Sequence, residues 1–213
     1  MNTYFIEQAR RLLAQRDWHG AHAASVRAVE QSPDDARAWL AKATIELAMR
    51  RASEARVSAE RAAALAPGDA RPWLLAGNAA QDAGERDAAR AAYARAVEAQ
   101  PEWGSAWNRV GTLAFEMGEA EQAERAFERA VACDPSHARS WNNLAHVRLE
   151  RGRIDEAEQA LKRALAVRPD YPVAFRNLAR VAAARGEARE REALELVATR
   201  LEAMQSHAAT AGP

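Results

Sequence analysis

The chain has 213 residues, 48% of them hydrophobic, and its 30 basic residues balance 30 acidic ones. This length and apolar content are enough to bury a sizeable core, which excludes a disordered polypeptide. The balanced charge gives no reason to expect a nucleic acid or a membrane surface as partner, and the single cysteine, Cys133, excludes an internal disulfide.

The amino-terminal stretch MNTYFIEQARRLLAQRD carries charged residues within its first turns and lacks the unbroken apolar segment of a signal peptide. No run of apolar residues in the sequence approaches the length of a membrane span. We therefore expect a cytoplasmic protein.

Proline recurs along the chain with a period of 34 residues, at Pro33, Pro67, Pro101, Pro135 and Pro169. An aromatic residue keeps the same period, at Phe5, Trp39, Trp73, Trp107, Trp141 and Phe175. Self-similarity at this period is typical of stacked supersecondary units. The sequence therefore predicts one array over residues 2–204, built from six repeats: 2–35, 36–69, 70–103, 104–137, 138–171 and 172–204.

Each repeat is predicted to be a helical hairpin. When the aromatic residue is numbered as position 4, alanine or glycine fills nearly every instance of positions 8, 20 and 27, where it would let two helices approach closely. Glycine at position 15 is expected to end the first helix in the left-handed conformation, at Gly84, Gly118, Gly152 and Gly186. The repeat proline stops the second helix, and the absence of strand-like alternation predicts an all-α fold.

The second repeat departs from this pattern, because Lys42 and Glu46 occupy positions where apolar packing is expected. They are four residues apart on one helix, so we expect a solvated or loosely packed ion pair, in preference to a site.

The second helix of the sixth repeat is degenerate. It keeps an apolar stripe formed by Leu194, Val197, Ala198, Leu201 and Met204. However, the polar residues Arg191 and Glu195 stand at positions 20 and 24 of the repeat, so the helix does not present a surface for another unit. We predict that this helix caps the array with a polar outer face, as terminal repeats do. Residues 205–213 are predicted to form a disordered tail.

The pattern resembles the tetratricopeptide repeat family. The fourth repeat carries it most fully, in Trp107, Val110, Gly111, Ala123, Phe127, Ala130 and Pro135. The resemblance implies a right-handed superhelical solenoid of antiparallel helix pairs, with the first helix of each pair lining a concave groove. It also implies a protein or peptide ligand in that groove.

Motifs for chemistry are scarce. The sequence contains no glycine-rich phosphate loop, nucleophile elbow, cysteine cluster or His-Glu-x-x-His motif, so we predict no catalytic residue and no cofactor. His19 and His22 lie near Asp17, but a structural or surface role is the preferred interpretation and no metal is predicted. The acidic residues of GEAEQAERAFER are interpreted as a solvated helix face.

Helical geometry places positions 2, 6, 9 and 13 of each first helix opposite its buried face, with position 5 on the flank. In the first three repeats the residues predicted to line the groove are mostly apolar: Leu40, Leu74, Leu75 and Asn78. In the last three they are basic or rich in amides: Asn108, Arg109, Arg139, Asn142, Asn143, His146, Arg176, Asn177 and Arg180.

These residue types suit a peptide ligand. An asparagine amide can pair with both groups of a peptide backbone, and Asn143 and Asn177 recur at position 6 in the spelling Asn-Leu-Ala, which is similar to the asparagine ladder of peptide-clasping members of the family. Arginine suits an acidic side chain or a terminal carboxylate. The alternative is a solvated polar face, on which acids such as Glu116 and Glu150 neutralise the arginines.

The sequence therefore predicts a non-enzymatic adaptor or scaffold that binds an extended peptide segment with an acidic or carboxylate-bearing end. Two alternatives remain open. The chain could recruit substrates for a glycosyltransferase- or sulfotransferase-like assembly, or it could be a structural homo-oligomer.

Overall fold

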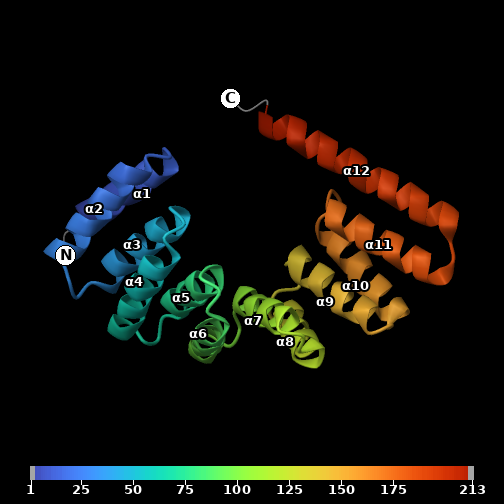
Figure 1. Ribbon diagram of the computed structural model, residues 1–213, viewed down its shortest axis with the longest axis horizontal. Coiled ribbons are helices and arrows are strands. Elements are labelled where there is room, and N and C mark those ends of the chain that lie inside the picture. The colour runs from blue at the N-terminus through green and yellow to red at the C-terminus, as the bar shows by residue number, and fades with distance from the viewer. Residues whose placement is uncertain (1–2, 211–213) are drawn as a thin grey trace. The chain divides into compact units, whose positions relative to one another are not determined.

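The computed structural model describes residues 3–210, which form twelve α-helices and no strand (Figure 1). They are α1 (Tyr4–Ala14), α2 (Trp18–Gln31), α3 (Ala36–Ala48), α4 (Ala52–Leu65), α5 (Ala70–Asp82), α6 (Arg86–Ala99), α7 (Gly104–Glu116), α8 (Ala120–Cys133), α9 (Ala138–Glu150), α10 (Ile154–Val167), α11 (Pro172–Arg185) and α12 (Ala188–Thr210). The all-α prediction is confirmed. None of the helices within this range is long and apolar enough to cross a membrane.

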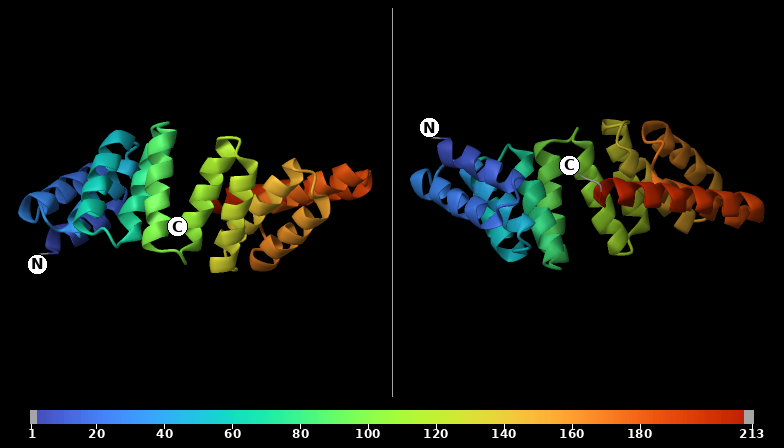
Figure 2. Two further views of the ribbon diagram at one scale, coloured as in Figure 1. Left: turned by 90° about the horizontal axis from the view of Figure 1, so that it is seen from below. Right: turned by 90° about the horizontal axis from the view of Figure 1, so that it is seen from above.

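The helices group into two compact units, Met1–Glu102 with α1–α6 and Trp103–Pro213 with α7–α12. Within each unit the two helices of a repeat pack together, and the second helix also packs on the first helix of the next repeat. Figure 2 shows this order of stacking within each unit from two further directions. The sequence predicted one array over residues 2–204, whereas the contacts place a boundary between the third and fourth repeats.

The predicted small positions form the contacts within the hairpins. Position 20 is wholly buried in the first five repeats, at Ala21, Ala55, Ala89, Ala123 and Ala157. Where position 8 is glycine, a large ring fills the space opposite it, since Gly77 faces Tyr93 and Gly111 faces Phe127. A β-carbon on Gly111 would lie 2.7 Å from the Phe127 ring.

The turns inside the hairpins use left-handed backbone. The four predicted glycines have φ between 72° and 79°, which confirms their role. The first two repeats place Arg16 and Arg50 at the same position, with φ of 61° and 62°. A residue with a β-carbon pays about 1 to 2 kcal/mol for this conformation, so these two turns are strained relative to the others.

The repeating tryptophan and proline are joined by a hydrogen bond. The Trp39 indole N–H donates to the Pro33 carbonyl at 2.7 Å, and Trp141 donates to Pro135 at 2.9 Å. The bond ties the start of a first helix to the turn that precedes it. The two residue types therefore recur together because they are in contact.

Two buried carboxylates correct the prediction of solvated charges. Lys42 and Glu46 do pair, with Nζ 2.6 Å from Oε1, but Glu46 is wholly buried. On α8, Glu124 of the acidic stretch is also buried, and Arg148 of α9 donates to it at 3.0 Å. Both carboxylates lie between helices because an arginine or lysine reaches them there.

The carboxyl-terminal helix is longer than expected. α12 continues to Thr210, so the predicted disordered tail is wrong for residues 205–210, and residues 211–213 lie outside the described range. No glycine or proline interrupts the sequence before Gly212, and the Gln205 side chain donates to the Asp170 carbonyl at 2.8 Å. Of the predicted apolar stripe, Ala198 is wholly buried, while Met204 is 62% exposed.

Candidate functional site

The candidate site lies on the second unit, across the first helices of its three repeats. α9 contacts both α7 and α11, so these helices lie side by side. Positions 2 and 9, which the sequence assigned to a groove, carry exposed or half-buried side chains on each of them. This surface, formed by α7, α9 and α11, is called the A face below.

Asparagine side chains join the helices of the A face. The Asn143 amide nitrogen on α9 donates to Asn108 Oδ1 on α7 at 3.1 Å, and the Asn177 nitrogen on α11 donates to Asn142 Oδ1 at 3.0 Å. Ser140 also donates to Asn108 Oδ1 at 3.1 Å. Each of the two amide–amide bonds runs from position 6 of one repeat to position 5 of the repeat before it.

These bonds correct the predicted roles of three amides. Asn108, Asn142 and Asn177 are only 4–6% exposed, so their side chains lie between helices and do not face a ligand. Asn177 donates to Asn142, and Asn108 accepts from Asn143 and Ser140, because a buried amide needs a hydrogen-bond partner. The adjacency of positions 5 and 6 in consecutive repeats is the sequence signal that could have indicated this pairing.

Asn143 is the amide that stays half-exposed. Its nitrogen bonds Asn108, and the structure records no hydrogen bond to its Oδ1 from the described residues. This oxygen is an acceptor that a backbone N–H could reach.

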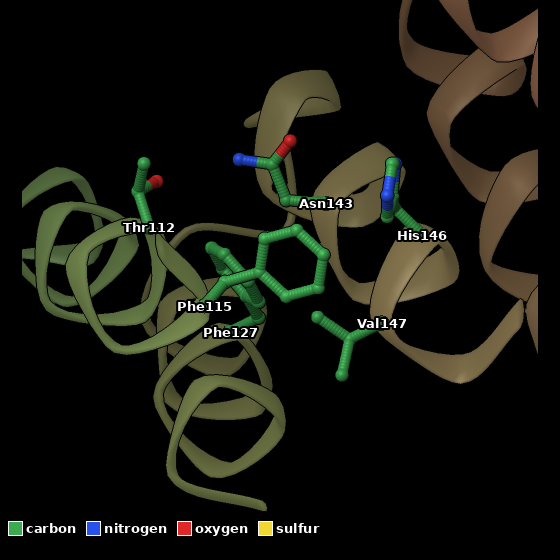
Figure 3. A pocket seen from close by; sticks show the side chains of 6 residues that line it. All are labelled: Thr112, Phe115, Phe127, Asn143, His146 and Val147. Atoms are coloured by element: carbon green, nitrogen blue, oxygen red, sulfur yellow. The ribbon is translucent and has the colours of Figure 1, made fainter. Parts of the chain in front are cut away.

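Asn143 stands at the rim of a pocket of about 180 Å³ between α7 and α9 (Figure 3). The lining residues are Thr112, Phe115, Phe127, Asn143, His146 and Val147. Two phenylalanine rings and Val147 make the floor apolar, and Thr112, Asn143 and His146 place polar groups around it. An apolar floor with a few polar groups at its rim is the usual composition of a ligand pocket.

The His146 ring packs edge-on against Phe115, with the ring centroids 5.0 Å apart. Burial lowers the pKa of His146, Arg180 lowers it further, and the Glu150 carboxylate opposes them. The ring is therefore neutral at pH 7. It can offer the pocket either a donor or an acceptor, according to its tautomer.

Two of the four predicted groove arginines are already paired. Arg180 of α11 bonds Glu150 of α9, which holds the pKa of that carboxyl below its usual range. Arg176 pairs with Glu202 of α12 at 2.5 Å. For Arg180 the alternative prediction, neutralisation by Glu150, holds, whereas the acid that pairs with Arg176 lies on α12 and was not among those predicted.

Arg109 and Arg139 differ, since the structure records no ion pair for either of them among the described residues. Arg139 is exposed and Arg109 is half-buried. Among the four predicted groove arginines, these are the two for which no ion pair is recorded within residues 3–210.

The remaining predicted residues belong to the first unit. Leu40, Leu74 and Leu75 are half-buried, and Leu75 packs against the core around Ala76. Asn78 Oδ1 accepts from the Tyr93 hydroxyl at 2.9 Å. These side chains are therefore partly engaged within the unit, and Leu40 also lines a small cavity of about 120 Å³ beside α1.

Stacked helical hairpins that present one face of first helices define a helical-repeat protein. The family model described as the C-terminal domain of cilia and flagella-associated protein 70, a tetratricopeptide-repeat domain, matches residues 4–211. The chain belongs to this tetratricopeptide-repeat family.

Solved structures under 25% identical share the fold. PilF of Pseudomonas aeruginosa superposes with a TM-score of 0.80 at 17% identity, covering 92% of this chain and 90% of that one. PilW, a type IV pilus biogenesis factor, gives 0.75 at 20% identity, covering 90% and 89%. YrrB, described as a TPR protein with an unusual peptide-binding site, gives 0.67 at 19% identity, covering 84% and 92%. No curated protein sequence matches the chain.

Proposed function

We propose that the protein is a non-enzymatic adaptor whose A face binds an extended segment of a partner protein. The observation that carries the proposal is the pocket between α7 and α9, which has an apolar floor and the unpartnered Asn143 Oδ1 at its rim. The peptide-binding site named for YrrB, a protein of the same fold, supports a ligand of this kind.

The pocket would take one apolar side chain of the ligand. Phe115, Phe127 and Val147 offer no hydrogen-bonding group, so burying a hydrocarbon there is favoured and burying a charge is not. Asn143 would accept the backbone N–H beside that side chain. This contact orients the backbone of the ligand and does not depend on the ligand's sequence, because every residue except proline carries the N–H donor.

Arg109 and Arg139 would meet an acidic side chain or a terminal carboxylate of the ligand. Neither has an acidic partner within the described residues, and a guanidinium binds a carboxylate through two parallel N–H groups. Arg176 and Arg180 would contribute less, because a ligand must first displace Glu202 or Glu150.

The test begins with capture of the partner from cell extract, identification by mass spectrometry, and mapping of the bound segment to a peptide. That peptide is then titrated by fluorescence anisotropy at low and high salt. Asn143→Ala should weaken acidic and neutral variants of the peptide by similar factors. The double variant Arg109→Ala, Arg139→Ala should weaken the acidic peptide most and flatten its salt dependence.

Arg163→Ala on α10 is the matched control, since it removes an exposed arginine away from the A face. Unchanged affinity in all the A-face variants would place the ligand elsewhere and contradict the proposal. A catalytic chain that co-purifies would favour the substrate-recruiting alternative. Concentration-dependent mass in light scattering would favour the homo-oligomer.

A further inference from the structure

A buried polar cluster lies in the first unit, where α2, α3 and α4 meet. Its centre is Glu46 of α3, which is wholly buried. Lys42 of the same helix donates to Glu46 Oε1 at 2.6 Å and to Ser58 of α4 at 2.9 Å. Lys42 is thus fully engaged on one side of the carboxylate.

The other side of the carboxylate is not satisfied. Glu46 Oε2 has no hydrogen-bond partner, and neither does the buried Nε2 of His22 on α2, which lies 3.7 Å from Oε1. A buried polar atom without a partner costs about 1 to 3 kcal/mol, so two of them at one point call for an explanation. Glu54 of α4 brings a second carboxylate to the same point, and the potential ligand atoms of His22, Glu46 and Glu54 all lie within 4.8 Å of one another.

The second unit contains the same contact in a satisfied form. Glu124 and Arg148 occupy the repeat positions of His22 and Glu46, one repeat apart in each case. There, Arg148 reaches Glu124 Oε1 at 3.0 Å and Arg151 reaches Oε2 at 3.2 Å, so both oxygens are paired. The unpaired atoms beside Glu46 are therefore a feature of this pair of repeats and not a requirement of the fold.

We propose that His22 Nε2, Glu46 Oε2 and the Glu54 carboxylate bind a first-row divalent cation of the Zn²⁺ type. One imidazole and two carboxylates are a ligand set that such ions accept, with water in a fourth position. The ion would satisfy both unpartnered atoms at once. Lys42 would donate the hydrogen bond that orients the Glu46 carboxylate, as residues that bond metal ligands without touching the ion commonly do.

An ion can reach these residues from the surface, and the ligand side chains can move toward it. Glu46 and Glu54 line a surface pocket of about 340 Å³, through which an ion can enter. Bonds of about 2.0 to 2.1 Å in a tetrahedral shell bring neighbouring ligand atoms to about 3.3 Å, so the outer side chains must move inward. The side chains of His22 and Glu54 are 25% and 56% exposed, and Glu54 would exchange its pairing with Arg51, whose Nη1 lies 3.5 Å from Oε2, for the ion.

His19 does not take part in this arrangement. It lies on α2 but is exposed, and the nearby Asp17 is engaged as the helix cap, accepting from the Gly20 N–H at 2.9 Å. The nearness of His19 to His22 in the sequence is therefore not the basis of the site. The ligands come instead from three helices and two repeats.

The test uses the full chain without an affinity tag, stripped with a chelator and titrated with ZnCl₂ by isothermal calorimetry and thermal denaturation. We expect one equivalent of Zn²⁺ to bind and to raise the melting temperature, because the ion binds the folded chain. His22→Gln and Glu54→Gln should each weaken binding at least about tenfold. Glu46→Gln should do the same while keeping an acceptor for Lys42.

His19→Gln is the matched control and should leave Zn²⁺ affinity unchanged. Absence of saturable binding in the wild-type chain would overturn the proposal, as would an equal affinity in His22→Gln. Binding that is lost in His19→Gln would also overturn it, since the ion would then sit at the surface. None of these readouts depends on the partner proposed for the A face.

Discussion

In the fourth and fifth repeats, the packing between the two helices of the hairpin depends on the residues at positions 8 and 24. Gly111 faces the ring of Phe127, whereas the fifth repeat places Ala145 and Leu161 at the same two positions. All four residues are buried. The volume lost at one position is thus regained at the other, as close packing requires.

Gly111→Ala should therefore destabilise the chain through overpacking, which costs about 1 to 3 kcal/mol, partly offset by the better helix propensity of alanine. Combining it with Phe127→Leu recreates the pair of the fifth repeat and should recover stability. Urea unfolding of both single variants and the double variant gives the coupling energy, expected at about 1 kcal/mol or more in favour of the double. Strict additivity would show that the two residues do not share the space.

At the level of residues, the sequence predicted which small side chains are buried, because the repeat period shows them directly. It did not predict that Asn108, Asn142 and Asn177 are buried. Amphipathic geometry assigns a side chain to a face of one helix, but the partner that buries it comes from the next repeat. Asn143 and Asn177 share position 6, yet the Asn177 side chain is buried and the Asn143 side chain is half-exposed.

Ion pairs between helices hold the second helix of one repeat to the first helix of the next. Glu124 of α8 accepts hydrogen bonds from Arg148 and Arg153 and forms an ion pair with Arg151, and it is 5% exposed. The sequence interpretation of GEAEQAERAFER as a solvated face is correct for Glu121 and Glu128 of α8, which are exposed. It is wrong for Glu124. Helical periodicity did not reveal arginines that lie more than twenty residues away.

Glu124→Ala should lower the free energy of unfolding by on the order of 3 kcal/mol, because it leaves three guanidinium groups without their shared buried carboxylate. Glu128→Ala is the control on the same helix. It removes an exposed acid that pairs with Arg148 at 2.8 Å, and it should cost less than about 1 kcal/mol. Equal losses in chemical denaturation would indicate that the network contributes nothing beyond its surface pairs.

For the whole molecule, the period of 34 residues was enough to predict twelve helices and their pairing. The boundary after Glu102 was not predictable, because Pro101 and Trp107 keep the repeat register across it. Similarly, the length of α12 was underestimated because the tail assignment relied on the end of the repeat pattern. A helix continues past that point when no glycine or proline stops it.

Two histidines and several carboxylic acids with lowered pKa values favour stability at neutral pH. Burial is the main cause that lowers the pKa of His137 and His146 below the ordinary value of 6.5. Hydrogen bonds from Arg37 and Arg71 lower the pKa of the helix-capping Asp35 and Asp69. When the solution is acidified, both the histidines and the acids with a lowered pKa reduce the stability of the folded chain, because the unfolded chain binds their protons more readily.

The stability of the chain should therefore fall in two steps as the pH is lowered. Below about pH 6.5, His137 and His146 bind protons more readily in the unfolded chain than in the folded chain, which lowers the free energy of unfolding. Below about pH 4, protonation of the carboxylates in the unfolded chain lowers it further. Thermal unfolding measured by circular dichroism across this range should show both steps. The double variant His137→Gln, His146→Gln should remove only the upper step, while His19→Gln, which changes an exposed histidine, should retain it. An upper step of the same size in the double variant would assign it to other groups.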